Sequence, residues 1–438
     1  MTGRRLTGLF VAALVVAVWT TGLCGEGDFG EWPQWRGPNR DAICTETGLL
    51  DEWPEDGPPL LWKMEGFGIG YATVAITGGR LYTTGDLELE GKTDSKGRPV
   101  REQFVIAADL ATRKIIWTAK VGPPHKDGSR CTPTVDDGLV YAVGTEGDLV
   151  CVRAGDGREV WRKSFKKDFG GRMMSGWKYS ESPLVDGEKL LCTPGGREAT
   201  MVALNKKTGE VIWKCAVPDL GGKGRYGAGY SSIVVAEVDG IRQYVQLFGK
   251  GVFGAEAESG KFLWGYNRVA NSVANITTPI VHGRYVFAST EYDTGSALLK
   301  LSRDGDGVKA EEVWWLSKDQ FQNHHGGVVL VDGHLYGGTN KNGGPPTCIE
   351  FATGEITWQV RPPAGGSAAY LWADGKFIVR YQTGPVTLVK ATPEKHEVVS
   401  TFRPPRGHGP AWPHPVVCGG RLYLRHRDFL LCYDLRAR

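Results

Sequence analysis

The feature that most constrains the fold is a tryptophan that recurs at nearly constant spacing. The intervals between its six copies are 44, 52, 51, 50 and 44 residues. The copies are Trp117, Trp161, Trp213, Trp264, Trp314 and Trp358. A period of this length is typical of a repeat architecture, in which one supersecondary unit is copied along the chain.

The segments that end in these tryptophans share one design, as in ALNKKTGEVIW (203–213) and CIEFATGEITW (348–358). The first residue is small, which a tightly packed sheet requires. The central Thr-Gly supplies a tight turn, because glycine adopts positive φ without steric cost. The residues after the turn indicate a half-buried strand, and the tryptophan is large enough to seal one sheet against the next.

A second signature alternates with the first, as in SPLVDGEKLLCTPG (182–195) and TPIVHGRYVFAS (278–289). Two short apolar runs joined by Asp-Gly or a similar pair predict a β-hairpin. Hairpin and tryptophan segment together give four strands, which is one propeller blade. Eight hairpin signatures begin near Thr73, Thr132, Ser182, Ser232, Thr278, Val328, Tyr370 and His414.

The sequence therefore predicts an all-β protein, an eight-bladed β-propeller with four-stranded antiparallel blades of about 47 residues each. The seventh copy is degenerate, with Ser400 in the tryptophan position. The eighth copy reaches CYDLRAR (432–438) without a fourth strand, and LLWKM (60–64) is the expected supplier. Closure by this N-terminal strand would remove the exposed sheet edges. The polar segment 86–103, inside the first blade, is predicted to be a solvated loop.

Three regions follow: residues 1–25 as a signal peptide, 26–59 as an N-terminal extension and 60–438 as the propeller. Arg4 and Arg5 precede ten apolar residues (9–18), which are too few to span a bilayer. We therefore expect an exported protein of the periplasm or cell envelope, with no transmembrane segment after cleavage. Cys24 leaves a lipoprotein alternative, although Leu23 stands where a lipobox requires a smaller residue.

Charge and cysteine content exclude several classes of partner and chemistry. A net charge of +3 is too small to indicate nucleic-acid binding, and nothing in the sequence suggests more than a monomer. Cys151, Cys348 and Cys432 occupy the small-residue position of the repeat and are expected to be buried. No C-x-x-C-H motif for covalent haem occurs.

The motif A-x-D/N-x-x-T-G-x-x-x-W in eight copies resembles the PQQ-like (quinoprotein-like) β-propeller repeat family, which includes PQQ-dependent alcohol dehydrogenases and the outer-membrane assembly factor BamB. The opening WPQWRGPNRDA (32–42) is similar to the start of exported PQQ-like proteins of planctomycete-type bacteria. The resemblance covers residues 60–438. It departs from the dehydrogenases because the chain has no Cys-Cys pair, and their calcium ligands and carboxylate base cannot be matched to positions here.

Two functions are compatible with this resemblance. The first is a binding or interaction module that takes a protein, polymer or small-molecule ligand at the mouth of its central channel. The alternative is a PQQ-dependent alcohol dehydrogenase of the polyvinyl-alcohol type, with PQQ and calcium as possible cofactors. Enzymatic activity is thus left open, no catalytic residue is assigned, and no metal site is predicted.

The candidate ligand-binding residues are those that precede each hairpin signature, because these segments converge on one mouth of the channel. An aromatic, concave surface with a few polar groups is the usual small-molecule or peptide site. The alternative is that these side chains only fill the channel. The candidates are Tyr71, Arg130, Trp177, Tyr179, Tyr230, Asn271, Asn275, His324, His325, Trp412 and His414.

His324 and His325 could suggest a metal site. Adjacent residues in a strand point to opposite faces, so a hydrogen-bonding or single-ligand role is expected instead.

Overall fold

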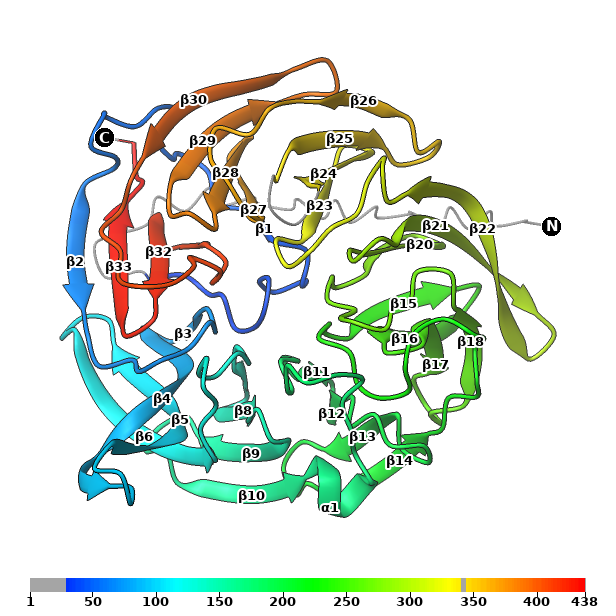
Figure 1. Cartoon of the computed structure of the whole chain (residues 1–438), viewed down its shortest axis with the longest axis horizontal. Coiled ribbons are helices and arrows are strands. Elements are labelled where there is room, and N and C mark those ends of the chain that lie inside the picture. Colours follow the sequence, from blue (N-terminus) through cyan, green and yellow to red (C-terminus); the bar gives the residue numbers. More distant parts are fainter. Residues whose placement is uncertain (1–28, 340–343, 438) are drawn as a thin grey trace, which may run out of the picture.

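The structure, a computed structural model, describes residues 29–339 and 344–437. Eight sheets are arranged as blades around a central axis, and one short helix, α1 (Phe165–Phe169), is present in the described ranges (Figure 1). The predicted eight-bladed, all-β propeller is confirmed. The predicted signal peptide lies outside the described residues. No helix in the described part is long and apolar enough to cross a bilayer.

Each blade is a four-stranded antiparallel meander, with its first strand innermost. The strands of blades one to four are β3 (Ala75–Thr77), β4 (Arg80–Thr93), β5 (Pro99–Asp109), β6 (Lys114–Gly122); β7 (Thr134–Asp136), β8 (Leu139–Val143), β9 (Asp148–Arg153), β10 (Glu159–Ser164); β11 (Leu184–Asp186), β12 (Lys189–Cys192), β13 (Met201–Asn205), β14 (Val211–Cys215); β15 (Val234–Val238), β16 (Ile241–Phe248), β17 (Gly251–Glu256) and β18 (Phe262–Tyr266).

Blades five to eight follow the same order, and the seventh gains a short parallel strand, β1 (Ile43–Cys44). Their strands are β19 (Ile280–His282), β20 (Tyr285–Thr290), β21 (Gly295–Asp304), β22 (Gly307–Ser317); β23 (Val328–Val331), β24 (His334–Gly338), β25 (Pro346–Glu350), β26 (Ile356–Gln359); β27 (Ala368–Ala373), β28 (Lys376–Tyr381), β29 (Val386–Ala391), β30 (His396–Phe402); β31 (Val416–Cys418), β32 (Arg421–His426), β33 (Phe429–Asp434) and β2 (Leu60–Met64).

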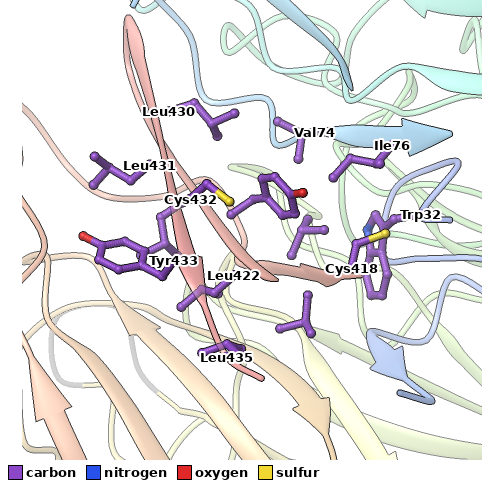
Figure 2. Close-up of a cluster of buried hydrophobic side chains, with 14 of the residues drawn as sticks. Trp32, Val74, Ile76, Cys418, Leu422, Leu430, Leu431, Cys432, Tyr433 and Leu435 are labelled. Carbon is purple, nitrogen blue, oxygen red and sulfur yellow. The ribbon is translucent and has the colours of Figure 1, made fainter. Parts of the chain in front are cut away.

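Blade eight is closed by the N-terminal strand, as predicted. β2 pairs antiparallel with β33, with Trp62 opposite Cys432 and Met64 opposite Leu430. The core beside this closure joins blades one and eight: Val74 and Ile76 of blade one pack with residues of β31 and β33 (Figure 2). The ring is therefore closed by main-chain hydrogen bonds and apolar packing together.

In five blades the recurring tryptophan ties the blade to the next one, whereas Trp264 donates to Gln243 of its own blade. Trp213 ends blade three, and its indole Nε1 donates to the carbonyl oxygen of Ala257 in blade four at 3.2 Å. Gly260, in the turn of blade four, has φ +73°, and a Cβ there would overlap with the Trp213 ring. The glycine of the motif thus serves the turn and also the contact with the preceding blade. The same indole-to-carbonyl bond to the following blade is made by Trp117, Trp161, Trp314 and Trp358.

Segment 86–103 is not a loop: β4 and β5 extend through it as a long hairpin that turns only at residues 94–98. Its alternating charges suit a solvated two-stranded ribbon as well as a loop, so polarity alone could not distinguish them.

Ser400 does take the tryptophan position, because it pairs with Leu388 before the same register shift seen in other blades. Its Oγ accepts a hydrogen bond from the main chain of Trp53 at 2.8 Å.

Candidate functional site

A cavity of about 370 Å³ occupies one mouth of the central channel. It is formed by the loops that connect the outermost strand of one blade to the innermost strand of the next. We call it the mouth cavity. Its lining residues are Trp35, Arg36, Tyr71, Lys126, Asp127, Arg130, Trp177, Ser180, Ser182, Tyr230, Ser232, Ala274, Ile276, Thr277, Thr278, Tyr292, His324, His325, Gly327, Pro410, Trp412 and His414.

The floor of the mouth cavity comes from Trp35 and Arg36, which belong to segment 32–44, here called the channel plug. This segment runs through the centre of the ring (Figure 1), and its residues contact all eight blades. The contacts, from blade one to blade eight, are Trp32 with Ile76, Pro33 with Val135, Arg40 with Ser182 and with Ile233, Trp35 with Thr278, Arg36 with Val328, Ile43 with Trp372, and Trp35 with His414. The mouth cavity is therefore blind.

Two buried arginines fix the channel plug. Arg36 and Arg40 are each 4% exposed. Arg36 donates to the Val328 carbonyl at 2.6 Å, and Arg40 donates to the Ile233 carbonyl at 2.8 Å. Burial lowers the pKa of both guanidinium groups to about 10, so both remain cationic at neutral pH.

One wall of the mouth cavity is a row of five rings, which we call the aromatic row. Its members are Tyr71, Trp412, His325, His324 and Tyr292, with successive centroids 4.7, 4.6, 3.8 and 5.5 Å apart. The Trp412 indole donates to the Gln382 side-chain oxygen at 2.9 Å. Offset and tilted aromatic pairs at these separations attract one another, so the row offers a preformed apolar surface.

The facing wall is more polar. Arg130 forms an ion pair with Asp127 at 3.0 Å and donates to the main-chain carbonyl of Trp177. The Tyr230 hydroxyl accepts from the Trp177 main-chain N–H at 3.2 Å and shares a hydrogen bond with Ser175 at 2.6 Å. These bonds fix the backbone of the loop while the Trp177 ring remains 47% exposed at the rim.

The predicted site residues divide into two groups. Eight line the mouth cavity: Tyr71, Arg130, Trp177, Tyr230, His324, His325, Trp412 and His414. The other three do not line it, and their side chains hydrogen bond to main-chain carbonyls. Tyr179 donates to the Pro194 carbonyl, Asn271 donates to the carbonyls of Ala274 and Glu291, and Asn275 donates to the Phe248 carbonyl.

The two adjacent histidines do not point to opposite faces, contrary to expectation. They lie in a loop before β23, where strand alternation does not apply, and their rings are 3.8 Å apart. The His324 Nδ1 is 3.0 Å from the Ser367 hydroxyl, and its Nε2 is 3.1 Å from the Tyr292 hydroxyl. His324 therefore has the hydrogen-bonding role that was expected.

Sequence reasoning missed the plug residues Trp35 and Arg36, together with Tyr292 and Asp127. Trp35, Arg36 and Tyr292 lie outside the segments that precede the hairpin signatures, whereas Asp127 lies in one of them, five residues before Thr132, and was not selected. The only signal for the plug was the Trp-Arg pair in WPQWRGPNRDA, which precedes the first repeat. Arg36 also has φ +62°, a left-handed conformation that local sequence does not predict for arginine.

Comparison with known proteins assigns the family. Residues 101–360, more than half of the chain, match the family described as outer membrane protein assembly factor BamB. The chain belongs to this family. The resemblance to PQQ-like propellers is thereby confirmed.

Individual members and relatives of the BamB family match only part of the chain in sequence. BamB of Shewanella oneidensis is 30% identical over 125 residues, which are 28% of this chain and 31% of that protein. The quinoprotein ethanol dehydrogenase of Pseudomonas aeruginosa is 26% identical over 149 residues, 34% of this chain and 22% of that protein. The chain thus spans about a third or less of these curated relatives.

Structural comparison agrees on the fold. The crystal structure of BamB from Moraxella catarrhalis superposes with a TM-score of 0.58 at 13% identity, covering 86% of this chain and 98% of that chain. At this identity the comparison shows a shared propeller and leaves function to be argued from the site.

The donor set of the mouth cavity does not fit a calcium-bound quinone. Calcium takes six to eight oxygen ligands, usually with several carboxylates. The mouth cavity offers one carboxylate, Asp127, which is already paired with Arg130. Nowhere in residues 29–339 or 344–437 do three or more His, Cys, Asp or Glu side chains gather so that they could hold a metal ion.

His414 provides a pH prediction. Burial, with smaller contributions from the charges of Arg36 and Arg380, lowers its pKa from 6.5 to about 4. The unfolded chain therefore binds this proton first as the pH falls. The stability that depends on neutral His414 is complete above pH 6.5 and is lost between pH 6.5 and 4, at up to about 1.4 kcal/mol per pH unit. We expect the ¹⁵N signals of this ring to stay constant from pH 8 to 5. A midpoint near 6.5 would contradict the buried position.

Proposed function

We propose that this protein is an exported binding module that takes a segment of a polypeptide partner in the mouth cavity and performs no chemistry on it. The observation that carries the proposal is the blind, preformed cavity with an aromatic wall above the channel plug. Concave apolar sites with a few fixed polar groups are where ligands usually bind. Rings with few rotatable bonds lose little entropy on binding.

Three titratable groups of the mouth cavity, His324, His414 and Asp127, support binding rather than catalysis. His414 Nε2 donates to the His325 carbonyl at 2.8 Å, and His324 uses both ring nitrogens in hydrogen bonds. Asp127 is paired with Arg130. A general base or nucleophile needs a free site that faces the substrate. Each of these groups is instead engaged in holding a loop.

The choice of a polypeptide partner is supported by the name of the BamB relative, an outer membrane protein assembly factor. The same relationship, together with the apolar segment 9–18 after two arginines, supports export to the periplasm or cell envelope. The quinoprotein ethanol dehydrogenase relative motivates the alternative, a PQQ-dependent dehydrogenase.

The proposal predicts that changing His325→Ala and Trp412→Ala together abolishes ligand binding while the melting temperature barely changes. Both side chains are only partly buried and lie at the rim of the fold, where truncation removes little core packing. Binding is measured with a peptide selected on the wild-type protein from a displayed random library. Melting is followed by circular dichroism.

A matched control uses a second Trp–His pair. Trp358 and His396 have ring centroids 5.3 Å apart on outer strands, far from the mouth cavity. Their replacement by alanine should lower the melting temperature and leave peptide affinity unchanged. If the mouth variant loses stability instead, or keeps its affinity, these rings are channel filler. A visible absorbance change and a heat of binding on addition of PQQ with calcium would favour the dehydrogenase.

A further inference from the structure

A buried cation, Arg36, lies in the floor of the mouth cavity. The Arg36 side chain donates through Nε to the Arg40 carbonyl at 3.3 Å and through Nη2 to the carbonyls of Asp41 and Val328 at 3.0 and 2.6 Å. Its Nη1 makes no hydrogen bond to any residue in the described part of the chain. One nitrogen of a fixed guanidinium group is therefore still able to donate.

The residue that carries this nitrogen borders the mouth cavity. Arg36, Gly327 and His414 all line the cavity. Gly327 has φ +73°, and a Cβ at this position would overlap with Arg36 Nη1. A larger residue would occupy the space beside the nitrogen, so the glycine leaves room there. The guanidinium itself is held rigidly, since three main-chain carbonyls and the plug surround its other nitrogens.

The charges around the cavity favour an anion. Arg36, Lys126 and Arg130 are its cationic residues, and Asp127 is its one acidic residue, already paired with Arg130. A positively charged floor beneath an apolar wall attracts a ligand that has a negative end and an apolar body. Hydrogen bonds between an arginine and a carboxylate are among the stronger ones that proteins make.

We propose that Arg36 binds the C-terminal carboxylate of a polypeptide partner, whose last side chain lies against the aromatic row. This inference rests on the proposed function and names the part of the partner that enters. A blind cavity admits a chain end directly. An internal acidic side chain would need the main chain to enter and leave through the same opening. Capture of a terminal carboxylate is a recurring mode of peptide recognition.

The test uses three matched arrays of random heptapeptides on the intact wild-type protein. The first array has free C-terminal carboxylates, the second has C-terminal amides, and the third has amides with an internal glutamate. We expect the free acids to bind at least about tenfold more tightly than the same sequences as amides. Equal binding of acids and amides would overturn the role of Arg36 and leave the binding module intact. If the third array binds as tightly as the first, the anion that Arg36 recognises is an internal side chain. If none of the three arrays binds, both proposals are overturned.

Two arginine variants separate recognition from folding. Arg36→Gln should abolish the preference for free acids, and Arg36→Lys should restore part of it. Arg40→Gln is the control, because Arg40 is equally buried, is bonded to main-chain carbonyls and belongs to the same plug, yet does not line the mouth cavity. It should lower stability and keep the preference. A preference that survives Arg36→Gln in a folded protein, or is lost in Arg40→Gln, would overturn the assignment.

Discussion

Replacement of Trp213 by alanine is expected to lower the free energy of unfolding by about 3–5 kcal/mol, the usual loss for a large buried aromatic residue. Trp213 is 7% exposed and packs against Gly260 of the next blade. Its indole also donates a hydrogen bond to the carbonyl oxygen of Ala257 in that blade. The truncation would therefore leave a cavity between blades three and four as well as an unpaired carbonyl. Chemical denaturation of the purified variant measures the loss.

Two further variants apportion this effect. Trp213→Phe retains much of the ring packing and loses the indole donor, so it should cost less than the alanine change. Gly260→Ala should be destabilising although it adds only a methyl group, because the residue needs φ +73° and lies under the Trp213 ring. A matched change at Gly187, which has φ +59° but open space around it, should cost less than Gly260→Ala. Equal losses at the two glycines would mean that the turn conformation matters and the contact with tryptophan does not.

The blades were predictable because their signals are periodic. Each hairpin start identified in the sequence lies at or within two residues of an innermost strand, and the strand that closes the ring was found because the eighth repeat lacked one. The contact between tryptophan and the glycine of the next blade was not foreseen. The two residues lie 47 positions apart in the case of Trp213 and Gly260. A repeat motif read one copy at a time hides such a contact between copies.

The candidate site was predictable only in part. Aromatic and polar residues at one repeat phase gave eight of the 22 residues that line the mouth cavity, including four of the five rings of the aromatic row. Its floor comes from a segment that occurs once, so no periodicity marks it. Asn271 and Asn275 were selected at the correct phase, but short polar side chains in loops commonly bond to nearby main chain instead of facing a cavity. The position of a residue within the repeat shows that it lies near the channel, but it does not show in which direction the side chain points.

Removal of residues 29–64 is expected to abolish cooperative unfolding. This change deletes β2 and the channel plug together. Loss of β2 leaves β33 with an unpaired edge and exposes a strand whose Leu430, Leu431 and Cys432 are at most 1% exposed in the closed ring. Open, apolar sheet edges also promote aggregation. We expect a broad, low-temperature transition in calorimetry and increased light scattering.

A second variant distinguishes closure from plugging. Replacement of residues 32–44 by a flexible Gly-Ser linker of equal length removes the plug and keeps β2. The carbonyls of Ile233 and Val328 would lose their arginine donors, but water could reach them through the opened channel. This protein should melt cooperatively at a reduced temperature, since the pairing of β2 with β33 still closes the ring. A deletion variant that melts at the full-length temperature would show that β2 does not hold the propeller closed. A linker variant that unfolds as badly as the deletion would assign that role to the plug.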